Sequence, residues 1–295
     1  MSGFQDSDLI IVAGRPGSGK TGLALTVALN AALYQNVPIG FFSLEMSAEQ
    51  LFKRLISMVS EVDSEKLKNG NLEDWEWEKV GNAIQLLSNA PIYIDDTAAL
   101  NILDLRAKAR RMKQKHGVQM VIVDYLQLMT GTRENGGNRE QEIASISRGL
   151  KTLAKQLNIP VIALAQLSRA VETRGGSKRP MLSDLRESGA IENDADIIAF
   201  IYRAEYYKIY EDEKGRSLKG VAEFIVSKHR NGGICTIYLK FLETYTLFLN
   251  SDFNDQHFPE DKPWEPHKHK KESVDTAVQS AIANQARMND EDIPF

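Results

Sequence analysis

The stretch GRPGSGKT, from Gly14 to Thr21, constrains the fold of this chain more than any other part of its sequence. It matches the pattern G-x-x-x-x-G-K-[ST], in which backbone N–H groups wrap a phosphate at the start of a helix. The apolar run DLIIVAG (8–14) leads into it, and KTGLALTVALNAALYQ (20–35) has the composition and length of a helix. A Gly-rich turn without a ligand is the alternative, but the strand–loop–helix context favours a nucleotide site.

The pattern also assigns roles within the loop. Its lysine, Lys20, reaches the β- and γ-phosphates, and its hydroxyl residue, Thr21, ligates Mg²⁺. The loop residues expected to bind ATP are Gly14, Arg15, Pro16, Gly17, Ser18, Gly19, Lys20 and Thr21.

Apolar runs and helical stretches alternate from residue 8 to residue 250. The other strand-like runs are PIGFFSLE (38–45), APIYIDD (90–96), VQMVIVDYLQL (118–128), IPVIALAQL (159–167) and DADIIAFIYR (194–203). Continuous apolar strands separated by helices are typical of a parallel sheet with both faces covered. We therefore predict an α/β P-loop fold with a mostly parallel central sheet flanked by helices. A hairpin at residues 221–240 adds antiparallel strands at one edge, and its Cys235 is expected to be buried.

Three polar side chains stand at the ends of predicted strands, where a parallel α/β sheet binds its ligands. Asp124 ends VIVD and is expected to hold Mg²⁺. Glu45, after FFSL, is either a solvated strand end or the base that activates water for attack on the γ-phosphate. Gln166, after ALA, is either a polar strand cap or an amide that senses the γ-phosphate. Together with the P-loop, these strand ends indicate an NTPase site.

Two basic segments allow a structural and a functional interpretation. The segment 168–196, SRAVETRGGSKRPMLSDLRESGAIENDAD, is either a solvated, mobile loop or a surface whose amides and cations contact phosphates. SKHRNGG (227–233) lies at the turn of the predicted hairpin, where a basic tip is often simply solvated. Phosphoryl transfer commonly uses a further cation, and the predicted site clearly supplies none besides Lys20.

Charge does not decide whether nucleic acid is a partner. The net charge is −4, but residues 251–295 hold ten acidic and five basic residues, which leaves 31 basic and 30 acidic residues in the body. A near-neutral body neither requires nor excludes nucleic acid. The chain contains no apolar run of 18 residues, so we expect a soluble, cytoplasmic protein without membrane contact.

Seven stretches, in this order, resemble the C-terminal motor domain of bacterial DnaB-type replicative DNA helicases. They are GFQDSDLIIVAGRPGSGKT, FFSLEMS, VIVDYLQLM, NREQEI, ALAQLSR, RPMLSDLRESGAIENDADI and SKHRNGG, and the resemblance covers residues 3 to about 250. The resemblance implies a RecA-like fold and a hexameric ring that uses ATP to translocate on single-stranded DNA and unwind duplex DNA. The partners it implies are single-stranded DNA, further copies of the chain, primase and a helicase loader.

The resemblance also implies roles for individual residues. It places the catalytic glutamate on Glu45, the Mg²⁺-holding aspartate on Asp124 and the sensor glutamine on Gln166. An arginine finger and an accompanying lysine, given in trans to the ATP of the next subunit, fall on Arg230 and Lys228. The remaining carried-over residues are Arg54 near the nucleotide and, for contact with the DNA backbone, Arg186, Glu187, Ser188 and Gly189.

The domain organisation departs from the family pattern at both ends. We expect a motor domain over residues 1–250, without the helical domain and linker helix that precede it in the family. Because that linker supports the ring, we expect weak or absent hexamers of this chain, and a tight ligand-free hexamer in mass photometry would contradict this. Residues 251–295 are expected to be a largely disordered acidic tail. Its end, NDEDIPF, resembles the partner-binding tip of bacterial single-stranded DNA-binding proteins.

Two other functions share the P-loop. One is a recombinase-like or DNA-repair ATPase that forms filaments, and the other is a nucleotide-switched binding module in which hydrolysis only resets binding. RESGAIENDAD and KHRNGG fit the helicase pattern better than the recombinase pattern. DNA-stimulated ATP hydrolysis together with strand separation would distinguish the three.

Overall fold

The computed structural model describes residues 3–130, 139–175 and 177–251, and at residues 186–189 it describes the backbone without the side chains. Residues 252–295, including NDEDIPF, lie outside the described residues. Within the described part of the chain, no helix has both the length and the apolar character needed to cross a membrane.

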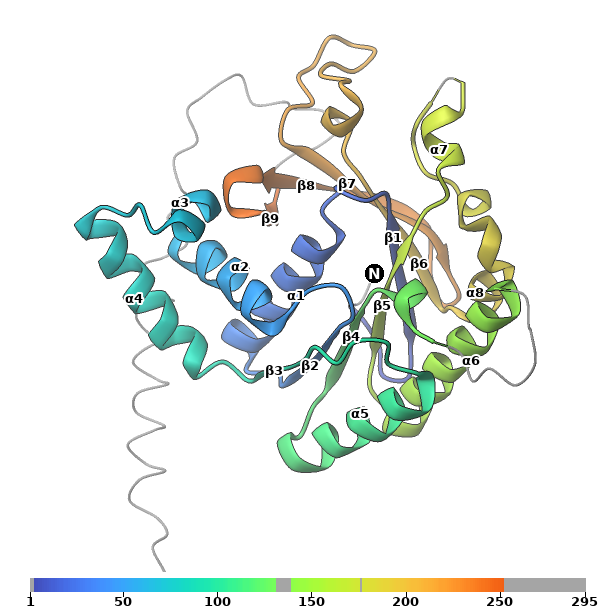
Figure 1. The fold of residues 1–295 in the computed structure, drawn as a ribbon. Helices are drawn as coiled ribbons and strands as arrows, with labels where there is room; N and C mark the ends of the chain where they lie inside the picture. The colour runs from blue at the N-terminus through green and yellow to red at the C-terminus, as the bar shows by residue number, and fades with distance from the viewer. Residues whose placement is uncertain (1–2, 131–138, 176, 252–295) are drawn as a thin grey trace, which may run out of the picture. The chain divides into compact units, whose positions relative to one another are not determined.

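One nine-stranded sheet organises the described residues, in the order β3-β2-β4-β5-β1-β6-β7-β8-β9 (Figure 1). The strands from β3 to β6 pair in parallel, and β7, β8 and β9 continue the sheet in antiparallel order. The strands are β1 (Leu9–Gly14), β2 (Ile39–Ser43), β3 (Ile92–Asp95), β4 (Met120–Asp124), β5 (Val161–Gln166), β6 (Ile197–Tyr202), β7 (Val221–His229), β8 (Cys235–Leu242) and β9 (Leu247–Asn250).

Helices cover both faces of the sheet. They are α1 (Lys20–Gln35), α2 (Ala48–Ser60), α3 (Ser64–Asn69), α4 (Asp74–Ser88), α5 (Ile102–His116), α6 (Arg139–Leu157), α7 (Ala170–Thr173) and α8 (Gly189–Asp194). Alternate residues of β1 enter different cores: Leu9 and Ile11 pack in the cluster of α5 and α6, whereas Ile10 packs in the cluster of α1, α2 and α4. The predicted three-layer α/β arrangement is therefore confirmed.

The edge of the sheet differs from expectation in two details. A third antiparallel strand, β9, pairs with β8 beyond the predicted hairpin. Cys235, expected to be buried, is exposed at the first position of β8. The alternation of strand side chains explains this error, because β8 near the edge of the sheet buries one face only.

Gly149 on α6 marks a close contact between two helices on one face. A Cβ built at Gly149 would lie 2.3 Å from Cγ1 of Ile102, the first residue of α5. We therefore expect Gly149→Ala to destabilise the fold by about 1–3 kcal/mol despite the better helix propensity of alanine. Gly81→Ala on α4, where a Cβ meets nothing within 4 Å, is the matched control and is expected to stabilise by up to about 1 kcal/mol. Thermal unfolding midpoints of the two variants should shift in opposite directions.

Candidate nucleotide-binding site

The carboxyl ends of the parallel strands bring the polar residues together. Gly14 at the end of β1 is in register with Gln166 at the end of β5. Asp124 at the end of β4 is in register with Ser43 at the end of β2, and Glu45 follows two residues later. The predicted strand over 38–45 thus ends at Ser43, and Glu45 belongs to the turn before α2.

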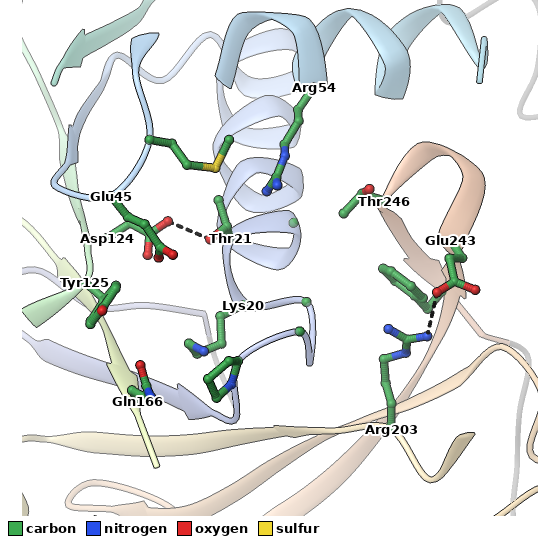
Figure 2. Close-up of a pocket in the computed structure, with 16 residues that line it drawn as sticks. Lys20, Thr21, Glu45, Arg54, Asp124, Tyr125, Gln166, Arg203, Glu243 and Thr246 are labelled. Carbon is green, nitrogen blue, oxygen red and sulfur yellow. Dashed lines mark hydrogen bonds and ion pairs between the residues drawn. The ribbon is translucent and has the colours of Figure 1, made fainter. Parts of the chain in front are cut away.

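A cavity of about 340 Å³ opens where these strands end (Figure 2). Of the predicted site residues it is lined by Pro16, Gly17, Gly19, Lys20, Thr21, Glu45, Arg54, Asp124 and Gln166. Figure 2 places the side chains of Glu45 and Asp124 beside Thr21, with Lys20 below them and Arg54 above. Chain segments that are more than a hundred residues apart in sequence therefore face a single cavity.

The backbone of the loop adopts the conformation that the glycine pattern requires. Gly17 and Gly19 have φ angles of 77° and 99°, in the left-handed region that favours glycine. At Gly19 a Cβ would also come within 2.9 Å of the ring of Phe248 on β9. The amide of Ser18 donates to the carbonyl of Arg15 at 3.1 Å, which closes the turn before α1 begins at Lys20.

Asp124 and Thr21 form the pair expected for a Mg²⁺ site. The Thr21 hydroxyl donates to Oδ2 of Asp124 at 2.7 Å, and Oδ1 of Asp124 is buried without a hydrogen-bond partner among the described residues. Burial raises the pKa of Asp124, since its carboxylate lies almost out of contact with water. Hard oxygen ligands of this kind fit Mg²⁺, which usually takes one or two protein ligands beside phosphates and waters. No cluster of three or more His, Cys, Asp or Glu suitable for a metal occurs in the described residues.

Lys20 is a half-buried cation at the start of α1, directly after the loop. Its Nζ donates to the carbonyl of Arg15 at 3.1 Å. Burial lowers the pKa of Lys20 to about 8, while the carboxylates of Asp124 and Glu45 act in the opposite direction. Burial also lowers the pKa of Arg54 on α2. Phosphate oxygens in this cavity would restore the stabilisation that both cations lose by leaving water.

Gln166 is held by its backbone, which leaves its side chain at the cavity. The Gln166 amide donates to Oε1 of Gln127 at 3.0 Å, and Nε2 of Gln127 donates back to the Gln166 carbonyl at 3.0 Å. Gln127 lies on the short 3-10 helix η1 (Leu126–Leu128), just after Asp124. Sequence reasoning did not single out Gln127, although it is part of the same VIVDYLQLM stretch as Asp124.

Three predicted loop residues do not line the cavity: Gly14, Arg15 and Ser18. The Arg15 side chain is buried and turns instead towards the end of β5 and α7. In the P-loop pattern Arg15 occupies a variable position, whose side chain the pattern does not constrain.

A second wall of the cavity consists of residues that sequence reasoning missed: Arg203, Phe241, Glu243 and Thr246. The Arg203 guanidinium stacks on the Phe241 ring, 3.9 Å from its centroid, and lies 3.8 Å from the Glu243 carboxylate. Figure 2 places this group across the phosphate loop from Glu45 and Asp124. Arg54 and Arg203 also face the cavity, so Lys20 is not its only cation among the described residues. Arg203 directly follows β6, so the strand-end rule that pointed to Gln166 would have found it.

Lys228 and Arg230 are predicted to be exposed and without partners in an isolated chain. Arg230 is exposed as expected, but Lys228 is half-buried and both side chains have partners. Lys228 Nζ donates to the carbonyls of Glu192 and, at 2.8 Å, Ala195. Arg230 donates to the carbonyls of Asn193 and Ala195 and lies 3.6 Å from Oδ1 of Asp196. The last carbonyls of a helix lack intrahelical partners and attract cations, so the end of α8 holds both side chains. Burial and the neighbouring guanidinium lower the pKa of Lys228.

The chain turns at residues 230–232, directly after β7, and neither Gly232 nor Gly233 has a positive φ angle there. The space beside Gly232 is taken by the His229 ring, 2.4 Å from a built Cβ, so packing explains glycine at that position.

The segment after β5, expected to be mobile, forms one ion pair within itself and another with β7. Arg174 donates to both Asp184 oxygens at 2.9 and 3.1 Å, and Arg179 pairs with Glu223 at 2.7 Å. The predicted DNA-contacting residues 186–189 belong to the 3-10 helix η2 (Leu182–Ser188) and the first residue of α8. Their side chains lie outside the described residues, so this assignment stays a prediction.

Comparison with known proteins agrees with this geometry. Residues 1–250 match the family model described as the DnaB-like helicase C terminal domain. The replicative DNA helicase DnaB of Geobacillus stearothermophilus is 48% identical over 260 residues, which are 88% of this chain and 56% of that protein. The chain thus spans about half the length of the curated relatives it matches.

Solved structures give the same result. "ATPase Domain of G40P" superimposes with a TM-score of 0.79 at 39% identity and covers 85% of this chain and 87% of that one. "The Structure Of A DnaB-Like Replicative Helicase And Its Interactions With Primase" superimposes with a TM-score of 0.78 at 39% identity, covering 85% and 59%. The predicted RecA-like P-loop fold is confirmed, and the chain belongs to the family of DnaB-like helicase C-terminal domains.

Proposed function

We propose that this chain is the ATP-hydrolysing motor of a replicative DNA helicase that translocates on single-stranded DNA and unwinds the duplex at the fork. The observation that carries the proposal is the convergence of Lys20, Thr21, Glu45 and Asp124 on one cavity in a chain of this family. Lys20 and the loop amides bind the β- and γ-phosphates of ATP. Thr21 and Asp124 hold Mg²⁺, which neutralises charge on the phosphates when bound.

Glu45 is the proposed base. It faces the same cavity as Asp124 and Lys20, from the turn between β2 and α2. A carboxylate in that place accepts a proton from the attacking water and orients it in line with the γ-phosphate. The guanidinium of Arg54 and, in trans, the guanidinium of Arg230 and the ammonium of Lys228 add positive charge where negative charge develops.

Gln166 is the proposed link to DNA. Its backbone is fixed by Gln127, its side chain reaches the nucleotide cavity, and the segment 168–190 begins two residues later. That segment contains Arg186, Glu187, Ser188 and Gly189, which we propose hold the DNA backbone largely through main-chain amides. Primase, a helicase loader and further copies of the chain in a hexameric ring are proposed partners. One structural neighbour, a DnaB-like replicative helicase, is described together with its interactions with primase.

Measuring the ATPase rate against protein concentration, with and without single-stranded DNA, tests this function. We expect a steep dependence on protein concentration, because a site shared between subunits forms only on association, and stimulation by DNA. A longer form containing the segments found in its relatives should separate the strands of a forked duplex. A rate per chain independent of concentration and of DNA would instead favour a nucleotide-switched binding module.

Arg203 provides a prediction about nucleotide affinity. A nucleobase is flat, and the guanidinium stacked on Phe241 offers a flat cationic surface across the cavity from the Mg²⁺ pair. We expect Arg203→Ala to raise the KM for ATP by about 2- to 30-fold with little change in kcat. Arg203→Lys keeps the charge but loses the planar surface, so it should rescue poorly. Inhibition by adenosine should weaken while inhibition by tripolyphosphate stays unchanged; the opposite pattern would place Arg203 on the phosphates.

A further inference from the structure

The side chain of Arg15 leaves the phosphate loop in the direction away from the nucleotide cavity. Its Nη1 donates to the carbonyl of Leu167 at 2.6 Å, and its Nε pairs with Oε1 of Glu172 at 2.8 Å. Leu167 directly follows Gln166, and Glu172 lies on α7. One guanidinium therefore connects the phosphate loop to both the end of β5 and the first helix of the segment that follows it.

This contact is stronger than an ordinary surface ion pair. The Arg15 side chain is only 6% exposed, whereas that of Glu172 is 39% exposed. Fully exposed pairs contribute little because water screens them and two long side chains must be ordered. A buried guanidinium has already lost its water and is fixed by the Leu167 carbonyl, so losing its carboxylate partner is more costly.

Hydrogen bonds connect the helix of Glu172 to the rest of the segment. The amide of Ser168 donates to the carbonyl of Asp184 at 3.1 Å, and Arg174, two residues after Glu172, holds both oxygens of Asp184. Lys178 donates to the carbonyl of Glu172 at 2.9 Å. Asp184 lies on η2, which also contains residues 186–188 and is followed directly by Gly189. A continuous set of contacts thus runs from Arg15 through α7 to Asp184 on η2, two residues before the first proposed DNA-contacting residue.

We propose that the Arg15–Glu172 ion pair couples the phosphate loop to the DNA-contacting segment, and that Glu172 is a positioning residue for DNA-stimulated ATP hydrolysis. The proposal rests on the proposed function and adds a second connection beside Gln166. Arg15 is part of the loop that wraps the phosphates, so a change in the loop on nucleotide binding alters the position of α7. Coupling between two binding sites is reciprocal, so DNA on the segment alters nucleotide affinity by the same factor.

Glu172→Ala and Glu172→Gln test the proposal, with Thr173→Ala as the control on the same helix. Thr173 is exposed, and its hydroxyl bonds the Ala170 carbonyl rather than Arg15. ATPase rates are measured with and without a thymidine oligonucleotide, at a protein concentration where the wild-type rate per chain no longer rises. The affinity for a fluorescent form of the oligonucleotide is measured with ADP and with a non-hydrolysable ATP analogue.

We expect both Glu172 variants to keep the rate without DNA within about twofold of wild type and to lose at least about fivefold of the DNA stimulation. The difference in oligonucleotide affinity between the two nucleotide states should shrink by a similar factor, and Glu172→Asp should retain part of it. Full DNA stimulation in both variants would overturn this proposal and leave the proposed function unaffected. If the rate without DNA fell by the same factor as the rate with DNA, the proposal would also be overturned, because the ion pair would then only stabilise the phosphate loop. A wild-type enzyme without DNA stimulation would overturn the proposed function as well.

Discussion

Replacing Glu45 by alanine is expected to lower kcat for ATP hydrolysis by about 10²–10⁴-fold and to leave the affinity for ATP nearly unchanged. Glu45 faces the cavity beside Asp124 but is separate from the residues proposed to grip the phosphates and Mg²⁺. Its removal therefore takes away the proton acceptor for the attacking water and leaves the binding contacts in place. Steady-state hydrolysis and the binding of a fluorescent ATP analogue measure the two quantities separately.

Two further variants make the result specific. Glu49→Ala, four residues later, removes an exposed carboxylate that pairs with Lys53 at 2.6 Å, and it should hydrolyse ATP normally. Lys20→Ala should lose binding as well as turnover, because the phosphates lose a charge-assisted contact. A Glu45→Ala variant that keeps more than about a tenth of the wild-type rate would remove Glu45 from the role of base.

The parts of the site that the sequence predicted share one physical property. Lys20 and Thr21 belong to a contiguous loop whose glycines are required by backbone conformation, so a short pattern identifies them. Asp124 and Gln166 end apolar strands, and parallel strands bring their carboxyl ends to one edge. Local sequence is sufficient where the backbone alone determines which residues meet.

The residues that were missed depend on packing between distant elements. Arg203 and Phe241 meet only because β6, β7 and β8 pair in antiparallel order, and no motif records that pairing. The hydrogen bonds of Lys228 to the end of α8 likewise join elements more than thirty residues apart. Cys235 shows the same limit, because its exposure depends on which face of β8 lies against the core.

Arg230→Ala is expected to lower the ATPase rate by about 10³–10⁵-fold under conditions where the chains associate, with ATP binding retained. The arginine is proposed to act on the ATP of the neighbouring subunit. The carbonyls of Asn193 and Ala195 at the end of α8 hold its guanidinium in this chain, so the side chain is restrained before any neighbour arrives. Arg148→Ala, which removes an exposed cation from α6, is the control and should leave the rate unchanged.

Mixing two inactive variants tests whether the finger acts in trans. Arg230→Ala chains have an intact phosphate loop, and Lys20→Ala chains have an intact finger. In a head-to-tail assembly, a complete site needs the phosphate loop of an Arg230→Ala chain and the finger of a Lys20→Ala neighbour. Random mixing of equal amounts produces this arrangement at about a quarter of the interfaces. We therefore expect recovery to about a quarter of the wild-type rate if sites act independently. Association of the two chains is verified by light scattering. If the activity does not recover although the chains associate, Arg230 acts within its own chain, where its contacts with α8 already hold it.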